Sequence, residues 1–404
     1  MNQNNSHLIA GFFRYHREKL NYSLRGLVGD GKVVDLSSLS AFEHGKKRLS
    51  ENQLIKLFEM INYDYETALK SYSFEKEYET LCEYIYLAEI KQAVALFKEC
   101  ESKGVFSSLG CINFSLIQYV LSSMNDKYIK FDDSCIIFES LYTSEQKVLL
   151  KIAHAYQYKN SGCFEKAINV LKESEKMTFD SKLQAFISQQ FSNYYVLLGN
   201  YAEATISLLD AKRRYGELLA LIPLIQVNLS LGTVYFLTNS YGKAEDSYIE
   251  AYNSTLLLKN STHLLTKCFN SLCWVYFNTN QYNKVNLLLS NKPNRLIESR
   301  NTYFTLAWAY YKIGNYEEAI KYCRDGLNKF KEYSYVCMIY EYIEKACMGV
   351  KTGQDALLRK IIETEDYDND AFTNKLFTYE IIDIYERRKN YEKAFKYAKK
   401  LLNR

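Results

Sequence analysis

Apolar side chains recur along most of the chain at the three- and four-residue spacing of amphipathic helices, with polar side chains between them. Residues 67–148 follow this period, as in EKEYETLCEYIYLAEIKQAVALFKECE. Only two Pro and 16 Gly interrupt the 404 residues, and both residue types oppose helix formation. The sequence therefore predicts an all-α fold. Its length predicts two or three domains or an elongated array.

A short unit of turn, aromatic residue, two variable positions and Ala or Val recurs in the second half of the chain. Its aromatic anchors are Phe164, Tyr201, Tyr241, Tyr282, Tyr316 and Tyr391. The first five anchors are separated by steps of 37, 40, 41 and 34 residues, and the last follows a gap of 75 that accommodates one degenerate repeat. Helix pairs that repeat with such a period are typical of an α-solenoid.

The segment AWAYYKIGNYEEAIKYCRDGL, residues 307–327, resembles the tetratricopeptide repeat. In such a repeat a small residue is needed where two helices cross, and the aromatic residues fill the space towards the next pair. The expected small positions are Ala167, Ala204, Ala244 and Ala319. Ordinary helical hairpins in a bundle are the alternative interpretation.

Residues 6–66 carry the start and stop signals of five short helices. Ser6, Ser23 and Asp35 are candidate N-caps, and Ser50 with Gln53 forms a capping box. The apolar residues expected to share one compact core are Leu24, Leu27, Leu36, Leu39, Phe42, Leu54, Leu57 and Phe58. This size and pattern indicate a helix-turn-helix domain.

The same segment resembles the Cro/C1-type DNA-binding domain near its third helix. The positions that match the hallmark of that family are Leu39, Ser40, Phe42, Glu43, Gly45 and Lys46. The chain departs from the family upstream, where the segment VGDGKVVD is longer and richer in Gly than the usual turn.

The resemblance implies a DNA-reading surface at the third helix. Ser37, Ser38, Ala41 and His44 are expected on its exposed face, within reach of base edges in the major groove. Lys32, Lys46, Lys47 and Arg48 are expected to neutralise phosphates. The first 50 residues hold eight basic and four acidic side chains, and thus the whole formal net charge of +4. A solvated basic loop is the alternative.

Stacked tetratricopeptide pairs expose their first helices on a concave surface that commonly receives an extended peptide. The aromatic anchor sets the register of each repeat, so the residues at fixed distances before it are predicted to point into the concave surface. Many of these residues are Asn or Gln, whose side chains can pair with both the N–H and the C=O of a peptide bond. The predicted peptide-binding residues are Gln189, Gln190, Asn193, Gln226, Thr233, Asn270, Trp274, Asn301, Thr305, Trp308 and Asp383. The alternative is that these residues are polar only because the groove is exposed to solvent.

Catalysis has little support in the sequence. The five His have no metal-ligand spacing, and no phosphate-binding or nucleophile motif is present, so we expect no catalytic residue, metal or cofactor. The ten Cys include no CxxC pair, which indicates reduced core thiols. A secretory signal and a long apolar run are both absent, so we expect a cytoplasmic protein that does not enter a membrane.

Together the two halves resemble the RRNPP group of peptide-sensing regulators of Gram-positive bacteria and their phages, and most of all the arbitrium receptors of temperate Bacillus phages. The resemblance implies a helix-turn-helix domain in residues 1–66 and a right-handed tetratricopeptide-like solenoid in residues 67–404. Helices at about 376–404 are expected to cap the solenoid or to form a dimer, because Phe395, Tyr397, Leu401 and Leu402 would otherwise be exposed.

The function implied is that of a homodimeric transcription regulator in the control of lysis and lysogeny. It would bind a double-stranded DNA operator and be switched by a short signalling oligopeptide through a population shift. Two alternatives remain open: a Rap-like tetratricopeptide module that binds proteins under peptide control without binding DNA, and a repressor that needs no peptide.

Overall fold

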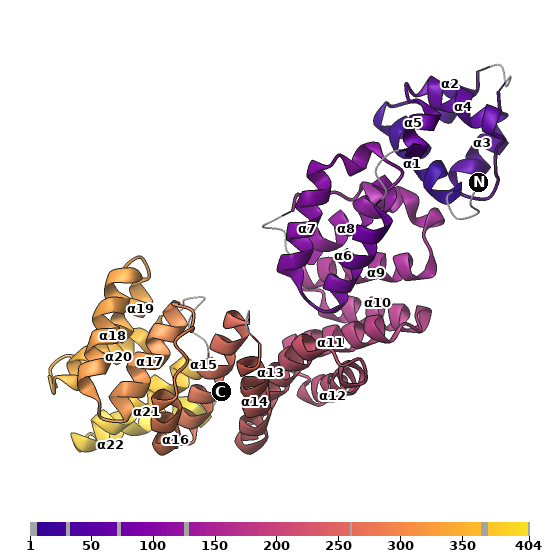
Figure 1. Ribbon diagram of the computed structural model, residues 1–404. Helices are drawn as coiled ribbons and strands as arrows, with labels where there is room; N and C mark the ends of the chain where they lie inside the picture. Colours follow the sequence, from indigo (N-terminus) through magenta and orange to yellow (C-terminus); the bar gives the residue numbers. More distant parts are fainter. Residues whose placement is uncertain are drawn as a thin grey trace. The chain divides into compact units, whose positions relative to one another are not determined.

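The computed structural model describes residues 6–29, 33–70, 74–124, 129–258, 261–364 and 371–402 (Figure 1). Within these ranges every regular element is a helix, which confirms the predicted all-α fold. The chain divides into two compact units, residues 1–227 and 228–404, and helix α13 (Leu221–Leu237) contains the point of division. No helix in the described ranges is long and apolar enough to cross a membrane.

The first unit begins with the five short helices that the sequence predicts. They are α1 (Ser6–Lys19), α2 (Leu24–Val28), α3 (Leu36–Glu43), α4 (Glu51–Met60) and α5 (Tyr65–Lys70). The Ser23 hydroxyl accepts from the Gly26 amide at 3.0 Å, and Asp35 accepts from the Ser38 amide at 2.8 Å. Ser50 and Gln53 form the predicted capping box. The predicted caps of α2, α3 and α4 are therefore confirmed, and each satisfies backbone donors that a helix start leaves unpaired.

A buried ion pair ties α1 to α3. Arg17 donates from Nε to Glu43 Oε1 at 2.5 Å and from Nη2 to Glu43 Oε2 at 2.8 Å. Its Nη1 donates to the Tyr22 carbonyl at 2.7 Å, and the Arg17 and Glu43 side chains are 9% and 1% exposed. A two-point contact of this kind fixes both the distance and the relative angle of the two helices.

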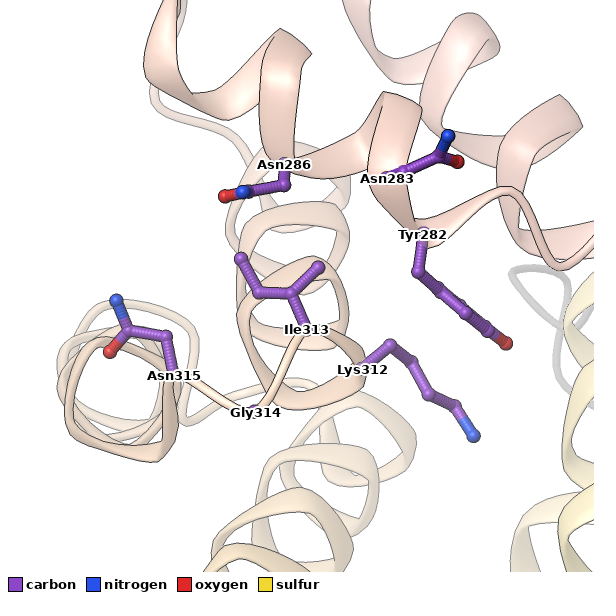
Figure 2. Close-up of a pocket in the computed structure, with 7 residues that line it drawn as sticks. All are labelled: Tyr282, Asn283, Asn286, Lys312, Ile313, Gly314 and Asn315. Carbon is purple, nitrogen blue, oxygen red and sulfur yellow. The ribbon is translucent and has the colours of Figure 1, made fainter.

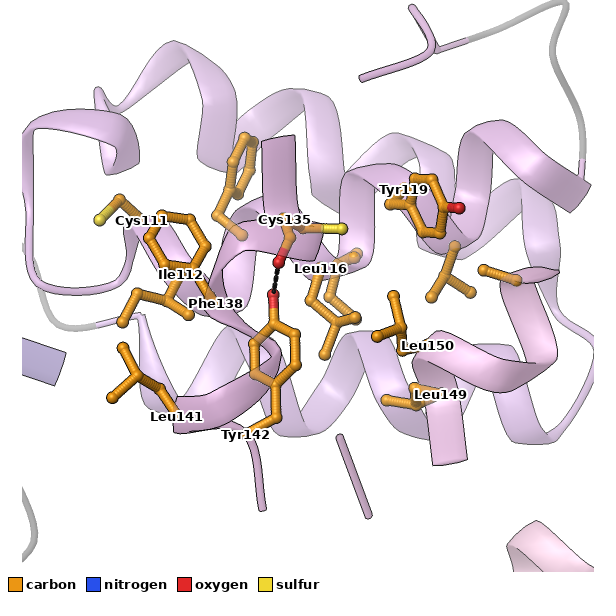
Figure 3. Packing of buried hydrophobic residues seen from close by; sticks show 14 of the residues in the cluster. Cys111, Ile112, Leu116, Tyr119, Cys135, Phe138, Leu141, Tyr142, Leu149 and Leu150 are labelled. Carbon is orange, nitrogen blue, oxygen red and sulfur yellow. Dashed lines mark hydrogen bonds between the residues drawn. The ribbon is translucent and has the colours of Figure 1, made fainter. Parts of the chain in front are cut away.

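The remainder of the first unit consists of longer helices and two 3₁₀ segments. They are α6 (Glu75–Tyr86), α7 (Ile90–Ser102), η2 (Val105–Ser107), α8 (Cys111–Met124), η3 (Ser134–Leu141), α9 (Ser144–Asn160), α10 (Phe164–Met177), α11 (Ser181–Leu197) and α12 (Tyr201–Glu217). Helix α8 is buried along nearly its whole length, and Figure 3 shows the apolar side chains around it. In this cluster the Tyr142 hydroxyl donates to the Cys135 carbonyl at 2.9 Å.

Helix α1 and the turn after α3 pack directly on later helices of the first unit. A Cβ on Gly11 of α1 would lie 1.8 Å from Ile112 Cδ1 of α8, and one on Gly45 would lie 2.9 Å from Leu141 Cδ2. A single apolar core extends from Leu8 to residues of α11. The predicted boundary between residues 66 and 67 falls inside α5 and stays a prediction.

The second unit comprises the end of α13 and the helices after it. They are α14 (Tyr241–Leu256), α15 (Thr262–Asn278), α16 (Tyr282–Ser290), α17 (Arg300–Lys312), α18 (Tyr316–Lys329), α19 (Ser334–Cys347), α20 (Gln354–Glu363), α21 (Ala371–Arg387) and α22 (Tyr391–Leu402). The pair α19 and α20 fills the long gap between the last two aromatic anchors, as the repeat spacing predicts.

The tetratricopeptide pattern is confirmed at each aromatic anchor, because every anchor is the first residue of the second helix in a pair. Two residues before the anchor the backbone has a positive φ, for example 82° at Gly314, where the absence of a Cβ makes this conformation inexpensive. The small residues three positions after the anchor, Ala167, Ala204, Ala244 and Ala319, are each 0% exposed. Both units therefore contain tetratricopeptide-like helix pairs.

One prediction from the sequence concerns aromatic residues near the C-terminus, and another concerns the Cys thiols. Phe395 of α22 is exposed, whereas Tyr397 is 5% exposed and stacks on Tyr385. The predicted role of these helices in capping or dimerisation stays a prediction. The side chain of Leu402 lies outside the described residues. Burial raises the pKa of Cys111 and Cys135 to about 12, which keeps these thiols protonated and suits them to the core.

Candidate functional sites

The N-terminus of α3 is held by a hydrogen-bond network around Asp35. Its carboxylate accepts from the Ser37 hydroxyl at 2.5 Å and from the Ser38 hydroxyl at 2.6 Å, and Lys47 Nζ donates to Ser38 Oγ. The hydrogen bonds from Ser37 and Ser38 hold the pKa of the Asp35 carboxyl well below its usual range. Ser38 is only 5% exposed, so its predicted place on the exposed face of α3 is wrong. The cap turns this side chain towards Asp35 and Lys47.

The other predicted DNA-binding residues differ in exposure. Ser37, Lys46, Lys47 and Arg48 are exposed, whereas Ala41 and His44 are half-buried. His44 ends α3, and its Nδ1 lies 2.8 Å from the Ser40 carbonyl. Lys32 lies outside the described residues. The structure therefore gathers Ser37 and the basic residues after α3 on the accessible surface of the N-terminal helices.

In the first unit the predicted amides of α11 have different environments. Gln189 and Gln190 are 7% and 5% exposed. Gln189 Oε1 accepts from the Tyr215 hydroxyl at 3.2 Å, and Gln190 Oε1 accepts from the Tyr156 hydroxyl at 2.8 Å. Their predicted place on an open groove is wrong, because these long side chains satisfy Tyr hydroxyls between the helices. Asn193 is exposed.

Gln226 and Thr233 both lie on α13, on either side of the division between the units. Gln226 is half-buried. Thr233 is exposed, and its hydroxyl donates to the Leu229 carbonyl at 2.9 Å and lies 3.1 Å from the Tyr248 hydroxyl. Thr233 therefore remains accessible to a ligand in the second unit.

Helices α15 and α17 of the second unit contact each other and bring several predicted residues together. Asn270 Nδ2 donates to Thr302 Oγ1 at 3.4 Å, while Asn301 beside it is exposed. Trp274 is half-buried, with its ring centroid 5.6 Å from that of Phe304. Asn270, Asn301 and Trp274 therefore provide accessible amide and indole groups where α15 and α17 meet.

Thr305 and Trp308 are each 0% exposed, so the prediction that they line an open groove is wrong. The Trp308 ring packs edge-on against Phe377 of α21 at 5.2 Å between centroids, which covers it. Within the described part of the chain, Thr305 Oγ1, Trp308 Nε1 and Asn270 Oδ1 are buried without a hydrogen-bond partner. Buried polar atoms are nearly always paired, and an ordered water is the usual partner where no protein group reaches them.

A polar cluster that the sequence did not predict joins α17, α19 and α21. Lys312 forms an ion pair with Glu380, and the Tyr342 hydroxyl donates to Glu380 Oε2 at 3.0 Å. Glu380 is 8% exposed, so it is a structural partner of Lys312. Asp383, one turn further along α21, is exposed and pairs with Arg387.

An open polar pocket of about 520 Å³ lies where the start of α16 meets the turn between α17 and α18 (Figure 2). Its lining residues are Tyr282, Asn283, Asn286, Lys312, Ile313, Gly314 and Asn315. The sequence-based prediction missed this pocket, although the segment NQYNKVN carries an unusual density of amides next to a repeat turn. No group of side chains suited to a metal ion occurs in the described ranges.

Comparison with known proteins supports the fold. The tetratricopeptide repeat family model matches residues 301–333. No curated protein matches the sequence. Three solved structures are similar in fold: the apo form of RapI, a Rap protein complexed with Competence and Sporulation Factor, and aspartyl phosphate phosphatase F from Bacillus subtilis.

The similarity extends over most of the chain but is low in sequence. RapI has a TM-score of 0.60 and 14% identity over 80% of this chain and 94% of its own. The Rap complex has a TM-score of 0.54 and 14% identity, over 81% and 96%. Phosphatase F has a TM-score of 0.52 and 16% identity, over 82% and 93%. The chain thus has the helical architecture of these proteins.

Proposed function

We propose that this protein is a peptide-responsive transcription regulator, of the kind represented by the arbitrium receptors. A short signalling oligopeptide would bind at α15 and α17, and the N-terminal helices would bind a DNA operator as part of a homodimer. The observation that carries the peptide-binding part is the accessible amide and indole surface where α15 meets α17, formed by exposed Asn301 and half-buried Asn270 and Trp274. A peptide main chain offers donors and acceptors that these amides can pair with.

The comparisons support a peptide ligand through the fold alone. One of the similar structures is a Rap protein in complex with a factor, so this architecture accommodates a bound partner in at least one case. The DNA-binding part is supported by the caps of α2, α3 and α4, which are those that the sequence predicts, and by exposed Lys46, Lys47 and Arg48 between α3 and α4. An enzymatic role has no comparable support.

Replacing both Asn270 and Asn301 with alanine is expected to weaken peptide binding about tenfold or more, because each amide removed leaves a peptide group unpaired. The measurement is the thermal stabilisation of the full chain by synthetic peptides encoded beside the gene, which should amount to about 2.7 kcal/mol at a hundred times the dissociation constant.

Asn253→Ala is the matched control, since Asn253 is an exposed amide on α14. It should leave the stabilisation unchanged. Equal stabilisation of the double variant and the unsubstituted chain would exclude α15 and α17 as the peptide site.

Replacing Lys46 and Arg48 with glutamine is expected to weaken binding to duplex DNA and to reduce the slope of log affinity against log salt by about two, since each phosphate contact contributes roughly one. A gel-shift titration between low and moderate salt measures this slope. The locus beside the gene and a mixed-sequence duplex are suitable probes.

Lys91→Gln with Lys98→Gln is the charge-matched control, because both side chains are exposed on α7, outside the N-terminal helices. An equal change of slope in the control would show that binding follows net charge alone. If the chain shows no binding to duplex DNA that weakens with salt, the DNA-binding part of the proposal is wrong.

A second candidate function is that of a Rap-like module that binds a protein partner under peptide control. It is favoured by the similarity to RapI over most of both chains. The gel-shift titration separates the two candidates, since only the transcription regulator requires binding to duplex DNA that weakens with salt. A repressor that needs no peptide would lack the thermal stabilisation by peptide.

A further inference from the structure

We propose that the pocket between α16 and the α17–α18 turn binds a carboxylate, specifically the C-terminal carboxylate of an oligopeptide. This inference rests on the proposed function for the identity of the ligand, but its chemistry comes from the pocket itself. The volume of about 520 Å³ lies within the range of small-ligand sites and accommodates the last residues of a peptide.

The lining of the pocket is rich in hydrogen-bond donors and carries no acidic side chain. Asn283 and Asn286 are exposed one turn apart at the start of α16. Asn315 uses Oδ1 to accept from the Glu318 amide at 3.3 Å as the N-cap of α18, which leaves its amide N–H groups available as donors. These carboxamides suit an acceptor-only group such as a carboxylate, whereas the Tyr282 hydroxyl already donates to Asn280 Oδ1 at 3.0 Å.

Lys312 is the basic residue that lines the pocket, and its ammonium points away from Asn286 and Asn315 (Figure 2). Its side chain is 19% exposed, and its ammonium is paired with Glu380. An ammonium has three donors, so Lys312 can keep Glu380 and still donate to a ligand. The Tyr342 hydroxyl also donates to Glu380, so the buried carboxylate does not depend on Lys312 alone. A ligand carboxylate would accept a charge-assisted hydrogen bond from Lys312. A C-terminal amide in its place is neutral, so its hydrogen bond to Lys312 would be weaker.

Trp308 reports on Lys312 directly. Lys312 Nζ lies 5.0 Å from the centroid of the Trp308 ring, within the range of a cation–π contact. The chain has only two Trp, and replacing Trp274 with phenylalanine leaves Trp308 as the single fluorophore. A ligand that draws the ammonium towards the pocket changes the environment of this buried indole.

The test titrates the full-length Trp274→Phe chain with N-acetyl-Ala-Gly and, separately, with the same dipeptide carrying a C-terminal amide. At constant ionic strength the free acid is expected to give a saturable change in Trp308 emission, with affinity at least tenfold above that of the amide. Equal responses to acid and amide, or no response to either, would overturn the carboxylate assignment.

Two substitutions locate the response. Asn286→Asp, added to the Trp274→Phe chain, places a like charge at the rim and should weaken binding of the acid at least about fourfold. Asn291→Asp is the matched control, because Asn291 is exposed at the end of α16 and does not line the pocket. Unchanged binding in the Asn286→Asp chain, or equal weakening in both chains, would place the carboxylate elsewhere and overturn the inference.

A failure here and a failure of the proposed function are distinguishable. The dipeptide titration needs no signalling peptide, whereas the Asn270 and Asn301 variants report on the contact with the peptide main chain. If the dipeptide acid and amide bind equally but the signalling peptide still stabilises the chain, only the carboxylate pocket is excluded. Dipeptide binding without any peptide stabilisation would leave a carboxylate pocket in a protein of another function.

Discussion

Replacing Arg17 with methionine is expected to lower the free energy of unfolding by about 3–5 kcal/mol, as is usual when one partner of a buried ion pair is removed. The Glu43 side chain is 1% exposed, so without Arg17 its charge would remain buried and uncompensated. The carbonyl of Tyr22 would also lose a donor at 2.7 Å. Chemical denaturation of the full chain, monitored by circular dichroism, measures the change.

Arg14→Met is the matched control on the same helix. Arg14 pairs with Glu18, whose side chain is 33% exposed, and such a pair contributes about 1 kcal/mol or less. A double substitution of Arg17→Met and Glu43→Leu should recover much of the lost stability, because it removes both buried charges. An equal loss in the Arg14 and Arg17 variants would contradict the role given to the buried pair.

Replacing Gly11 with valine is expected to destabilise the first unit by about 1–3 kcal/mol or more, as overpacking of a filled core does. A Cβ at this position would lie 1.8 Å from Ile112 Cδ1 and 3.3 Å from Leu141 Cδ1, so α1 would have to move away from α8 and η3. Because α1 also carries Arg17, this shift would disturb the N-terminal helices as a group. Thermal unfolding of the full chain measures the loss.

Gly216→Ala provides the control, since a Cβ on this helical Gly of α12 meets no atom within 4 Å. Alanine there should be neutral or stabilising by up to about 1 kcal/mol, because it favours helix more than Gly does. If Gly11→Val unfolds at the same temperature as the unsubstituted chain, the close packing of α1 on α8 is not part of the stable fold.

The contacts at Gly11 and Gly45 connect the N-terminal helices, which we propose to bind DNA, to the rest of the first unit. The N-terminal helices share one apolar core with the helices up to α11. Within that core α1 contacts α8 and η3 directly, and the ion pair of Arg17 and Glu43 connects α1 to α3. This connection is local to the first unit.

Much of the fold could be predicted because helix boundaries depend on nearby residues. Ser23, Asp35 and Ser50 cap helices by accepting from the backbone amide three residues later, so their roles can be predicted from the sequence. The aromatic anchors and the small Ala residues of the repeats were predictable for the same reason, because each belongs to the packing within one helix pair. These features were all confirmed.

The candidate site was predicted less well. Periodicity placed Thr305 and Trp308 on the inner face of their repeat but could not show that Phe377, distant in sequence, covers that face. The same limit applies to Gln189 and Gln190, whose amides bind Tyr hydroxyls of other helices. Long side chains reach partners that helical spacing does not specify.

The sequence by itself determined the helices, their caps, the tetratricopeptide-like pairing and the position of the basic residues after α3. These depend on local hydrogen bonding and on packing between neighbouring helices. Only the tertiary structure decided which polar residues remain accessible, which became core, and that Lys312 meets Glu380 next to an amide-lined pocket. The physical reason is that burial and ion pairing between repeats are set by how helix pairs stack, and stacking brings together side chains that no local pattern connects.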